Sequence, residues 1–349
     1  MALQTLKGIR IVGMTVCMPS TVVENADMPF EGMERMIKTT GIERRRVAPV
    51  GLTSSDLCVR ASEDVLNGTN TDTEDIGLIV FVTQSPDYKA PSTAHIIQDR
   101  LGASHECLTF QINEGCSGYV HGLYLASVML KGMPGKKALL LVGDTSSADC
   151  NIEDKSTRPL FGDAGTATLL ENNKNAEAIH FYMGGDGSGY KDIIIPHGSG
   201  GRHKVTDKSF QVVEENGLKR RPVDLHLDGM NVFTFGITKV PKAVKYHWGE
   251  LGIDAGSIDY AVFHQANMMM NEKIRKKLKL APEQVPYSLK NYGNTSGASV
   301  PVTMVTQLKE ALTSETKKYF LCGFGIGVSW ANAYLTIPPL QYVNQTDYD

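Results

Sequence analysis

The sequence predicts an α/β protein that is built from two similar halves. Three pairs of matching segments support this prediction, because a strand-like run with a turn or a helix in the first half recurs in the second. The first members of the pairs lie within residues 1–172 and the second members within residues 223–349. A chance similarity between strand–helix units is the alternative. If the duplication is real, turns that are far apart in the sequence can converge on one central site.

The first pair consists of a buried strand followed by a helix. Residues 76–83, IGLIVFVT, are apolar and rich in β-branched side chains, which is typical of a strand covered on both faces, and 93–101 follow as a helix. Residues 258–264, IDYAVFH, predict a similar strand. The helix that follows it is predicted over 268–279, MMMNEKIRKKLK.

The second pair places a tight Ser-Gly turn between a strand and a helix. Residues 107–113 predict a strand that runs into GCSGYVHGLYLASVML, and residues 286–291, PYSLKN, predict a strand that runs into YGNTSGASVPVTMVTQL. The third pair is formed by 136–147 and 317–329, and each member has two lysines, a strand and a glycine-bearing turn.

The residues between the two halves have a different character. Residues 173–222 are predicted to be a loop-rich insertion or linker, and 184–222 are rich in Gly, Lys and Arg, with one possible strand at QVV. The sequence therefore divides into 1–172, which carries a candidate cysteine, the linker 173–222, and 223–349, which carries a candidate histidine and asparagine.

The composition is that of a soluble globular protein with a large core. The 349 residues are 42% apolar and 21% charged, and the net charge is −3. Without a basic excess, the chain has no general field for binding nucleic acid. No run of about eighteen apolar residues predicts a membrane span. The N-terminus lacks the apolar core of a signal peptide and reads as a first strand.

The cysteines predict reduced thiols in a cytoplasmic protein. They are scattered and form no CxxC pair, so no metal site is expected. The absence of a secretory signal favours the cytoplasm. One cysteine is a candidate nucleophile and the rest are expected to be small core residues; the six are Cys17, Cys58, Cys107, Cys116, Cys150 and Cys322.

Cys116 is the candidate nucleophile. It lies between a predicted strand and a predicted helix, and Gly115 and Gly118 permit a sharp turn and close approach by a ligand. The positive end of the helix dipole is expected to lower the pKa of the thiol, and the thiolate is the form that attacks a thioester. The alternative is a small buried cysteine at a tight turn.

Two further polar residues end matching units of the second half. His264 ends the strand IDYAVFH, at the side of an α/β sheet where ligands bind. Asn294 lies in YGNTSG, the counterpart of the Cys116 turn. Each has a structural alternative, a histidine satisfied within the core and an asparagine that bonds its own turn. The three residues together, at matching ends of duplicated units, favour a catalytic site.

Several motifs resemble those of the β-ketoacyl-acyl carrier protein synthase III family of the thiolase superfamily. The resemblance is carried by NEGCSGYVHGL, FHQANMMMNEKI, YGNTSGASVP and GFGIGVSW, with TGIERR, LFGDAGTA and LDGMNVF as further landmarks. The match is collinear and covers nearly the whole chain. It implies a five-layer αβαβα thiolase fold and a homodimer.

The resemblance also implies a reaction. Cys116 would take the acyl group from a thioester, and His264 and Asn294 would donate hydrogen bonds to the thioester oxygen of a malonyl extender, which we expect to be malonyl-acyl carrier protein. Loss of CO2 would leave an enolate that attacks the acyl-Cys carbonyl and gives a β-ketoacyl product. The backbone N–H groups of Cys116 and Ile326 would hold the second oxyanion. No cofactor is expected, because acyl-CoA or acyl carrier protein is itself the substrate.

Substrate-binding residues also follow from the resemblance. Ala90 stands where typical members place a bulky Phe from the partner subunit, so the acyl pocket is expected to accept longer or branched groups. The residues implied to bind substrate are Ala90, Lys155, Phe161, Gly229, Phe233, Asn267 and Phe324.

The chain departs from the family at the expected CoA site. Typical members stack adenine on a Trp and hold it with an Arg just before the TGI segment, and those positions are Arg35 and Thr39 here. Lys155 stands where a second nucleotide-holding Arg is usual. We therefore hypothesise that the primer arrives on a carrier protein, or that CoA binds differently.

A basic helix implies a docking site for the acidic carrier protein. The resemblance places docking near 273–279, through Lys276 and Lys277, and a solvated helix face is the alternative. One docking Arg of the family appears as Met269, in a methionine run whose other interpretation is core filling. The 200–222 insertion could also touch the carrier or the substrate.

The HQAN and GNTSG turns contain no Asp or Glu, which fits decarboxylation because that step needs no carboxylate base. Glu114 is interpreted as a strand-end or interface residue, and a base near the site is the alternative. Three rival functions are acyl transfer to a hydroxyl or amine, a papain-like cysteine hydrolase, and a non-catalytic binding subunit. Retention of His264 and Asn294 favours carbon–carbon bond formation, since oxygen transfer needs no enolate site.

Overall fold

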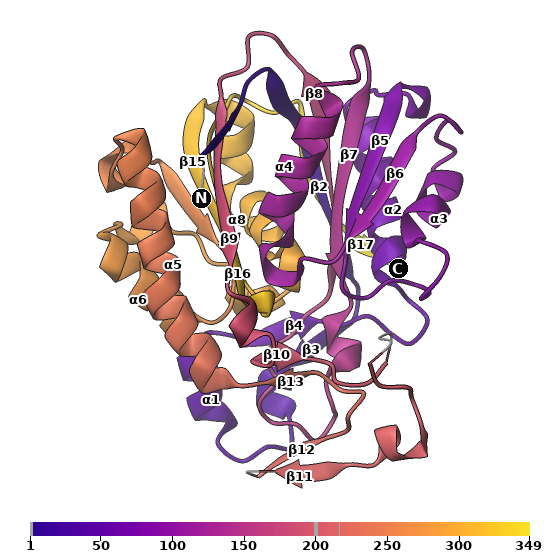
Figure 1. The fold of residues 1–349 in the computed structure, drawn as a ribbon, viewed down its shortest axis with the longest axis vertical. Helices are drawn as coiled ribbons and strands as arrows, with labels where there is room; N and C mark the ends of the chain where they lie inside the picture. The colour runs from indigo at the N-terminus through magenta and orange to yellow at the C-terminus, as the bar shows by residue number, and fades with distance from the viewer. Residues whose placement is uncertain (1–2, 199–201, 216) are drawn as a thin grey trace.

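The computed structural model describes residues 3–198, 202–215 and 217–349, and these residues form five layers (Figure 1). An outer helix pair is followed by a five-stranded sheet, a central helix pair, a six-stranded sheet and a second outer helix pair. The helix pairs are, in that order, α5 (Gly229–Leu251) with α6 (Met268–Leu278), α4 (Gly118–Leu130) with α8 (Ser299–Ser314), and α2 (Ser54–Gly68) with α3 (Thr93–Arg100). This arrangement confirms the thiolase-like αβαβα fold.

The six-stranded sheet consists mainly of strands from the first half. Its β5 is buried at every residue, because helices cover both faces of the sheet. At one edge lies β6, where Leu108 is 46% and Phe110 is 40% exposed. The strand order is β17 (Tyr342–Tyr348), β2 (Ile9–Pro19), β8 (Ala164–Asn172), β7 (Lys137–Asp144), β5 (Ile76–Val82) and β6 (Leu108–Ile112).

The five-stranded sheet brings two strand ends of the second half together. β14 and β15 run parallel, with Phe263 paired to Cys322, so the residues that follow them emerge at the same edge. The strand order is β1 (Gln4–Leu6), β9 (Ile179–Gly185), β16 (Ser329–Ile337), β15 (Lys317–Gly325) and β14 (Tyr260–Phe263).

The main core lies between the two sheets. The central helices α4 and α8 fill this space, and side chains such as Leu123 and Val302 are fully buried against both sheets. A helix between two sheets must be apolar on several sides, whereas an outer helix needs only one apolar face. Separate clusters hold the outer pairs, with Val65 of α2 in one and Ile274 of α6 in the other.

Each terminal strand crosses to the sheet of the other half. β1 pairs antiparallel with β9 in the five-stranded sheet, and β17 pairs parallel with β2 in the six-stranded sheet. The sequence division at 172 and 223 places β1 in the first half and β17 in the second. Each of these strands nevertheless pairs within the sheet of the opposite half.

Two segments differ from the expected secondary structure. Residues 286–291 are predicted as a strand, but the short helix α7 (Leu289–Tyr292) begins within them instead. Their backbone groups are satisfied locally and by a side chain, because the N–H of Ser288 donates to Gln265 Oε1 and the N–H of Gly293 to Leu289 O. The linker 173–222 is also less irregular than expected, since it contributes β9 to a sheet.

The remaining elements lie together below the sheets in Figure 1. Among them, α1 packs against α6. The expected strand at QVV begins at its last residue, in β11, while 200–201 and Asn216 of the insertion lie outside the described residues. No helix in the described ranges is long and apolar enough to cross a membrane. These elements are α1 (Met33–Thr40), β3 (Val22–Glu24), β4 (Arg44–Arg46), β10 (Ile193–Ile194), β11 (Val213–Glu215), β12 (Leu218–Arg220) and β13 (His226–Leu227).

Candidate active site

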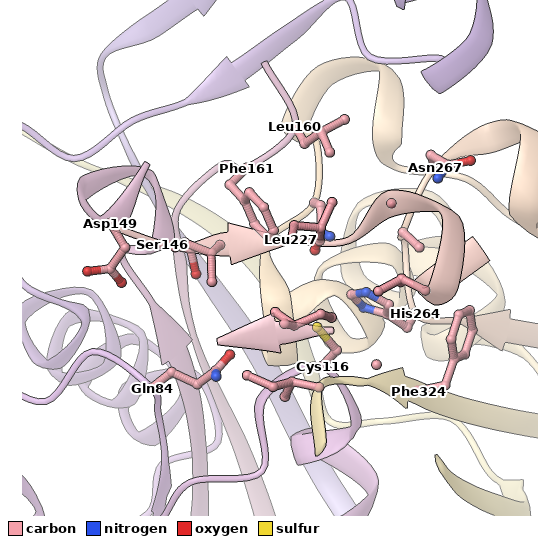
Figure 2. A pocket seen from close by; sticks show the side chains of 18 of the residues that line it. Gln84, Cys116, Ser146, Asp149, Leu160, Phe161, Leu227, His264, Asn267 and Phe324 are labelled. Atoms are coloured by element: carbon pink, nitrogen blue, oxygen red, sulfur yellow. The ribbon is translucent and has the colours of Figure 1, made fainter. Parts of the chain in front are cut away.

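Turns from both halves converge on one cavity. Cys116 lies in the turn η3 (Gly115–Ser117) between β6 and α4, and His264 directly follows β14. Asn294 precedes the turn η9 (Ser296–Ala298) at the start of α8. All three residues line the same cavity with Ile326, which follows β15. Figure 2 shows the sulfur of Cys116 and the imidazole of His264 facing this cavity from opposite halves of the chain.

Two glycines make the turn at Cys116 possible. Gly115 has φ of +47°, which favours glycine, and a Cβ there would collide with the side chain of Ile326. Gly325 faces the nucleophile, since a Cβ at this position would lie 2.6 Å from the Cβ and 2.9 Å from the Sγ of Cys116. The sequence prediction of a sharp, closely approached turn agrees with this geometry.

The pKa of Cys116 differs from the expectation. Burial raises the pKa of the thiol to about 11, and the carboxylate of Asp144 adds to this effect. The backbone N–H groups of Ile326 and Cys116 and the hydroxyl of Ser296 oppose it. We expected the helix dipole to lower the pKa, but α4 begins only at Gly118 and desolvation is the larger effect. Burial of the sulfur therefore favours the neutral thiol over the thiolate.

His264 is buried and neutral. Burial lowers the pKa of its imidazole to about 3, and a backbone hydrogen bond to Ser296 opposes that shift. Its Nδ1 lies 2.7 Å from Ser299 Oγ, which also accepts the N–H of Gln265 at 3.3 Å. Since that hydroxyl already accepts a hydrogen bond, its own hydrogen can be donated to Nδ1. In that tautomer the proton of the neutral ring is on Nε2, the nitrogen that can donate to a ligand.

Asn294 is fixed on both its backbone and its side chain. Its N–H donates to Leu160 O at 2.9 Å and its C=O accepts the N–H of Gly162 at 3.0 Å, which ties the turn to Phe161. Its Oδ1 accepts the N–H of Ser296 at 2.9 Å. The side-chain amide nitrogen therefore remains as the donor that Asn294 can offer to a ligand in the cavity.

The backbone of Ile326 provides a second donor site. Its N–H bonds to the thiol of Cys116, together with the N–H of Cys116 itself. Two N–H groups that converge on the sulfur are also close to any carbonyl oxygen attached to it, which is the geometry of an oxyanion hole. Ile326 thus lies where the sequence prediction places it.

A buried acid supports the turns from behind. Asp144 ends β7 and accepts the N–H of Gln84 at 2.6 Å and the hydroxyl of Thr83 at 3.1 Å. Burial raises its pKa, while hydrogen bonds from the N–H groups of Gln84 and Gly297 and from the hydroxyl of Thr83 oppose the shift. The HQAN and GNTSG turns contain no acid of their own. Asp144, at the end of β7, supplies a buried acid behind them.

The cavity has a polar wall and an apolar wall. In Figure 2, Gln84, Ser146 and Asp149 lie on one side of Cys116, while His264 and Phe324 lie on the other. Apolar side chains complete the lining, and the residues that the sequence prediction missed are Gln84, Ser146, Asp149, Leu160, Ile193, Ile195, Leu225, Leu227, Val232, Ala266, Met270 and Gly325. For Gln84 and Ser146, the available signal was their position two residues after the ends of β5 and β7, close to the position of His264 after β14.

The predicted substrate-binding residues divide into two groups. Phe161, Gly229, Asn267 and Phe324 line the cavity. Asn267 also caps α6, since its Oδ1 accepts the N–H of Met270 at 2.8 Å. Phe233, Lys155 and Ala90 do not line the cavity of this chain. Phe233 packs beside Lys273, whose Nζ lies 5.0 Å from the ring centroid, whereas Lys155 and Ala90 are exposed.

The residues predicted for docking and for CoA lie on the surface. Lys276 and Lys277 are exposed on α6, and Nζ of Lys277 donates to Ile237 O at 2.6 Å. Arg35 is exposed on α1, where Thr39 donates its hydroxyl to Arg35 O. The methionine run has mixed roles, because Met269 is 42% exposed while Met270 is buried in the cavity wall.

Glu114 lies outside the cavity. Its side chain is 43% exposed and its Oε2 lies 3.9 Å from His121 Nδ1. In the 200–222 insertion, Arg220 donates to Asp154 at 2.6 Å and Lys219 to Glu153 at 2.9 Å, so β12 rests on the loop that carries Lys155. Among the described residues, no group of three or more His, Cys, Asp or Glu side chains is arranged to hold a metal ion.

Comparison with known proteins gives consistent matches along the chain. Residues 110–187 match the family model described as 3-oxoacyl-[acyl-carrier-protein] synthase III, and 249–337 match the model of its C-terminal part. The β-ketoacyl-[acyl-carrier-protein] synthase III of Caldanaerobacter subterraneus is 32% identical over 337 residues, covering 93% of this chain and 96% of that protein. The Rhodopirellula baltica protein of the same name is 30% identical, with 94% and 98% covered. A crystal structure of 3-oxoacyl-(acyl-carrier protein) synthase from Burkholderia xenovorans has a TM-score of 0.92 and 37% identity, with 99% of both chains covered.

Proposed function

The chain belongs to the 3-oxoacyl-[acyl-carrier-protein] synthase III family, and from this premise we propose that it loads an acyl group onto Cys116 and condenses it with malonyl-acyl carrier protein. The enzyme is an acyltransferase that forms a β-ketoacyl thioester with loss of CO2. The observation that carries the proposal is the convergence of Cys116, His264 and Asn294 on one cavity beside the N–H of Ile326.

The loading step transfers the acyl group between two sulfurs. The Cys116 sulfur attacks the carbonyl carbon of the primer thioester, and the bond from that carbon to the carrier sulfur breaks. His264 donates its Nε2 proton to the departing carrier thiolate and takes up the proton of the Cys116 thiol in exchange, so the ring is neutral again afterwards. The oxyanion of the tetrahedral intermediate is held by the N–H groups of Cys116 and Ile326. The products are acyl-Cys116 and a free carrier thiol.

The condensation step forms the carbon–carbon bond. The bond between the malonyl carboxylate and its α-carbon breaks, CO2 leaves, and the electron pair forms an enolate whose oxygen accepts hydrogen bonds from His264 and Asn294. The enolate carbon attacks the acyl carbonyl, and the bond to the Cys116 sulfur then breaks. The thiolate takes up one proton from water, and the β-ketoacyl group leaves on its carrier. These steps balance with side chains, two thioesters and that solvent proton, so we propose that no metal or organic cofactor takes part.

The two donors favour this chemistry over acyl transfer to a hydroxyl or amine. A buried donor without an acceptor is costly, and transfer to oxygen or nitrogen creates no second oxyanion for His264 and Asn294 to hold. A papain-like hydrolase and a non-catalytic subunit are both disfavoured by family membership together with the complete set of reacting groups.

The test is intact-mass analysis with malonyl carrier added in a second step. Wild-type protein should gain the acyl mass and then release it as the β-ketoacyl product with one CO2 for each turnover. Cys116→Ala should gain no acyl mass, whereas His264→Ala and Asn294→Ala should load and then fail to condense. Acyl release to an added amine or alcohol without CO2 would favour the rival acyltransferase.

A homodimer through β6 is part of the proposal. β6 is an edge strand whose Leu108 and Phe110 are exposed, and such edges pair readily with a second copy. Gln111 of β6 accepts the N–H of Thr93 at 2.8 Å, so the loop that carries Ala90 adjoins the same edge. Phe110→Glu should shift the mass measured by light scattering toward the monomer, while Val50→Glu, at an exposed position elsewhere, should not.

Carrier docking at α6 and a cytoplasmic location complete the proposal. Lys276 is the better docking candidate, because the ammonium of Lys277 already bonds the backbone of α5. Lys276→Glu should raise the KM for malonyl carrier without changing the acylation of Cys116 by a small thioester. The six cysteines are all unpaired thiols, which suits the reducing cytoplasm.

A further inference from the structure

Arg45 is a charged side chain that lies completely buried beside the turn of Asn294. It belongs to β4 and its exposed fraction is 0%, whereas Arg44, its neighbour in the same strand, is exposed. Burial lowers the pKa of the Arg45 guanidinium to about 10, and the charge of Arg158 adds to this effect, so the group remains protonated at neutral pH. Because a buried charge is costly unless it is hydrogen-bonded, the partners of Arg45 indicate what it does.

The guanidinium of Arg45 joins chain segments that are far apart in the sequence. Its Nε donates to Asn25 Oδ1 at 2.9 Å, and its Nη1 donates to the backbone C=O of Phe161 at 2.9 Å. Its Nη2 lies 3.9 Å from Sδ of Met28. These three partners are uncharged, and the rigid fork of donors on an arginine fixes their positions relative to one another.

Asn25 holds the same segment at a second point. Its Nδ2 donates to Pro159 O at 2.9 Å. Residues 159–161 are therefore held at two carbonyl groups, one by Asn25 and the other by Arg45. The residue between these carbonyl groups, Leu160, lines the cavity (Figure 2).

This segment pairs with the backbone of Asn294. The N–H of Asn294 donates to Leu160 O at 2.9 Å. The N–H of Gly162 donates to Asn294 O at 3.0 Å, so Asn294 forms a parallel bridge with Phe161, the residue whose carbonyl group Arg45 holds. A shift of this segment would therefore move the backbone from which the side-chain amide of Asn294 projects.

The aliphatic stem of Arg45 contacts the same turn directly. Gly293 has φ of +64°, and a Cβ at this position would lie 2.9 Å from Cγ of Arg45 and 2.7 Å from Leu160 O. The chain thus approaches the arginine as closely as a glycine permits. Arg45 consequently supports Asn294 in two ways, through the carbonyl of the paired segment and through the residue that precedes it.

We propose that Arg45 is a positioning residue for condensation, which aims the amide nitrogen of Asn294 at the thioester oxygen of the malonyl extender. This inference rests on the proposed condensation step, in which Asn294 donates to the enolate oxygen. The loading step uses Cys116 and Ile326, which lie in the turns after β6 and β15 rather than in the segment that Arg45 holds. Loss of Arg45 should therefore impair condensation more than loading.

The experiment compares the two steps in variants of the full chain. Intact mass measures the loading of Cys116, and single-turnover release of CO2 from preloaded enzyme with malonyl-acyl carrier protein measures condensation. Arg45→Met keeps the stem and removes the donors, whereas Arg45→Lys keeps the charge. Arg44→Met is the matched control, because Arg44 belongs to the same strand and only forms a salt bridge with exposed Glu24 at 3.2 Å.

Arg45→Met is expected to load as Arg44→Met does and to release CO2 roughly tenfold to a hundredfold more slowly, because misplacement of a donor by about 1 Å has an effect of this size. Arg45→Lys should recover part of this loss, since an ammonium group can still donate to one of the acceptors. In the Asn294→Ala background, Arg45→Met should cause no further loss, because the amide that it aims is already absent. A purely structural role would not produce this dependence on Asn294.

The outcomes separate this inference from the proposed function. If wild type loads no thioester, or if Asn294→Ala condenses normally, the proposed function fails. If wild type and Asn294→Ala behave as proposed, equal losses of loading and condensation in both Arg45 variants would refute the positioning role. A loss caused by Arg45→Met that is as large in the Asn294→Ala background as in the wild type would also refute it.

Discussion

The hydroxyl oxygen of Ser299 lies 2.7 Å from Nδ1 of His264. Ser299 is the first residue of α8, so the central helix orients the imidazole that serves the cavity. Because the same hydroxyl accepts the N–H of Gln265, it can donate to Nδ1 and hold the ring in the tautomer that carries its proton on Nε2. A residue that does not itself line the cavity thus contacts and orients the imidazole of His264.

Ser299→Ala should impair condensation more than loading. Without the hydroxyl, the Nε2–H tautomer loses its stabilising partner, and the donor to the enolate oxygen is present for only part of the time. Removal of an oxyanion donor costs about 10²–10³-fold in rate, so we expect a loss of roughly tenfold for Ser299→Ala and the larger loss for His264→Ala. Single-turnover release of CO2 from preloaded enzyme measures the effect. Ser314→Ala, at the end of α8, is the control, and an equal loss in both serine variants would contradict the role of Ser299.

The reactivity of Cys116 should rise steeply with pH in the free enzyme. Since burial raises the pKa of the thiol to about 11, the thiolate fraction at pH 8 is about 10⁻³ and grows about tenfold for each pH unit. The rate of alkylation by iodoacetamide, followed by mass, should therefore climb from pH 7 to 10 without a plateau. Cys116→Ala gives the background rate. A plateau near neutral pH would mean that Cys116 and His264 form a thiolate–imidazolium pair.

Gly325→Ala should block acylation of Cys116. The added methyl group would lie 2.9 Å from the sulfur, so the strand end and the neighbouring Ile326 amide must shift away from the nucleophile. A displacement of about 1 Å at a reacting centre can cost roughly 10²-fold in rate, and we expect a loading defect of at least that size. Gly249→Ala, at a helical position with open space, should load normally. Normal loading by Gly325→Ala would show that the turn at Cys116 has room to move.

His247 should make the fold sensitive to acid. It is fully buried, both ring nitrogens lack a partner among the described residues, and burial lowers its pKa to about 4. The unfolded chain takes up this proton near pH 6.5, before the folded chain does, so stability is present above pH 6.5 and is lost as the pH falls toward 4. At pH 5 this loss is about 2 kcal/mol.

His247→Leu should therefore lose about 2 kcal/mol less than wild type in the free energy of unfolding between pH 8 and pH 5. Urea unfolding at one protein concentration measures the difference. His105→Gln, at an exposed position, should follow the wild-type pH dependence. Parallel curves for wild type and His247→Leu would show that His247 is not responsible for the acid sensitivity.

The primer is expected to arrive on carrier protein rather than on CoA. The family resemblance implies that Arg35 and Thr39 stand where a nucleotide-binding Trp and Arg are usual, and β12 rests on the loop that carries Lys155. Loading rates with the same acyl group on CoA and on carrier should differ in favour of the carrier. The double substitution Arg35→Trp and Thr39→Arg should improve the use of CoA, whereas Lys38→Trp should not. A clear preference of the wild type for acyl-CoA would overturn the hypothesis.

The sequence alone predicts the fold, and it selects three candidate residues that the structure brings to one cavity, because both depend on local patterns. The segments 76–83 and 258–264 are short apolar runs, and a buried strand is the structure that suits such runs best. The turns at Cys116 and Asn294 are fixed by their own glycines and by the helices that follow. The short helix at Leu289 was missed because its backbone is satisfied by Gln265, a partner that sequence periodicity does not reveal.

The pKa of Cys116 and the polar cavity wall could not be predicted for a related reason. The pKa depends on how completely the thiol is buried under Ile326 and on the approach of Asp144, and both are long-range contacts. Asp149 looked like any other acidic residue near a strand end. Only the packing of β10 and β13 against its loop makes it a cavity residue, through neighbours such as Ile193 and Leu227.

Because the two terminal strands cross between the halves, neither half has a complete sheet of its own. A cut between residues 172 and 173 would leave β1 on the fragment whose sheet does not use it, and would separate β17 from its neighbour β2 in the six-stranded sheet. Each fragment would expose an unpaired edge and its uncovered apolar residues until the other arrived. The two parts of this chain can thus be exchanged with those of a relative, or produced as a split protein, only if the strand at each end is moved along with the half that it completes.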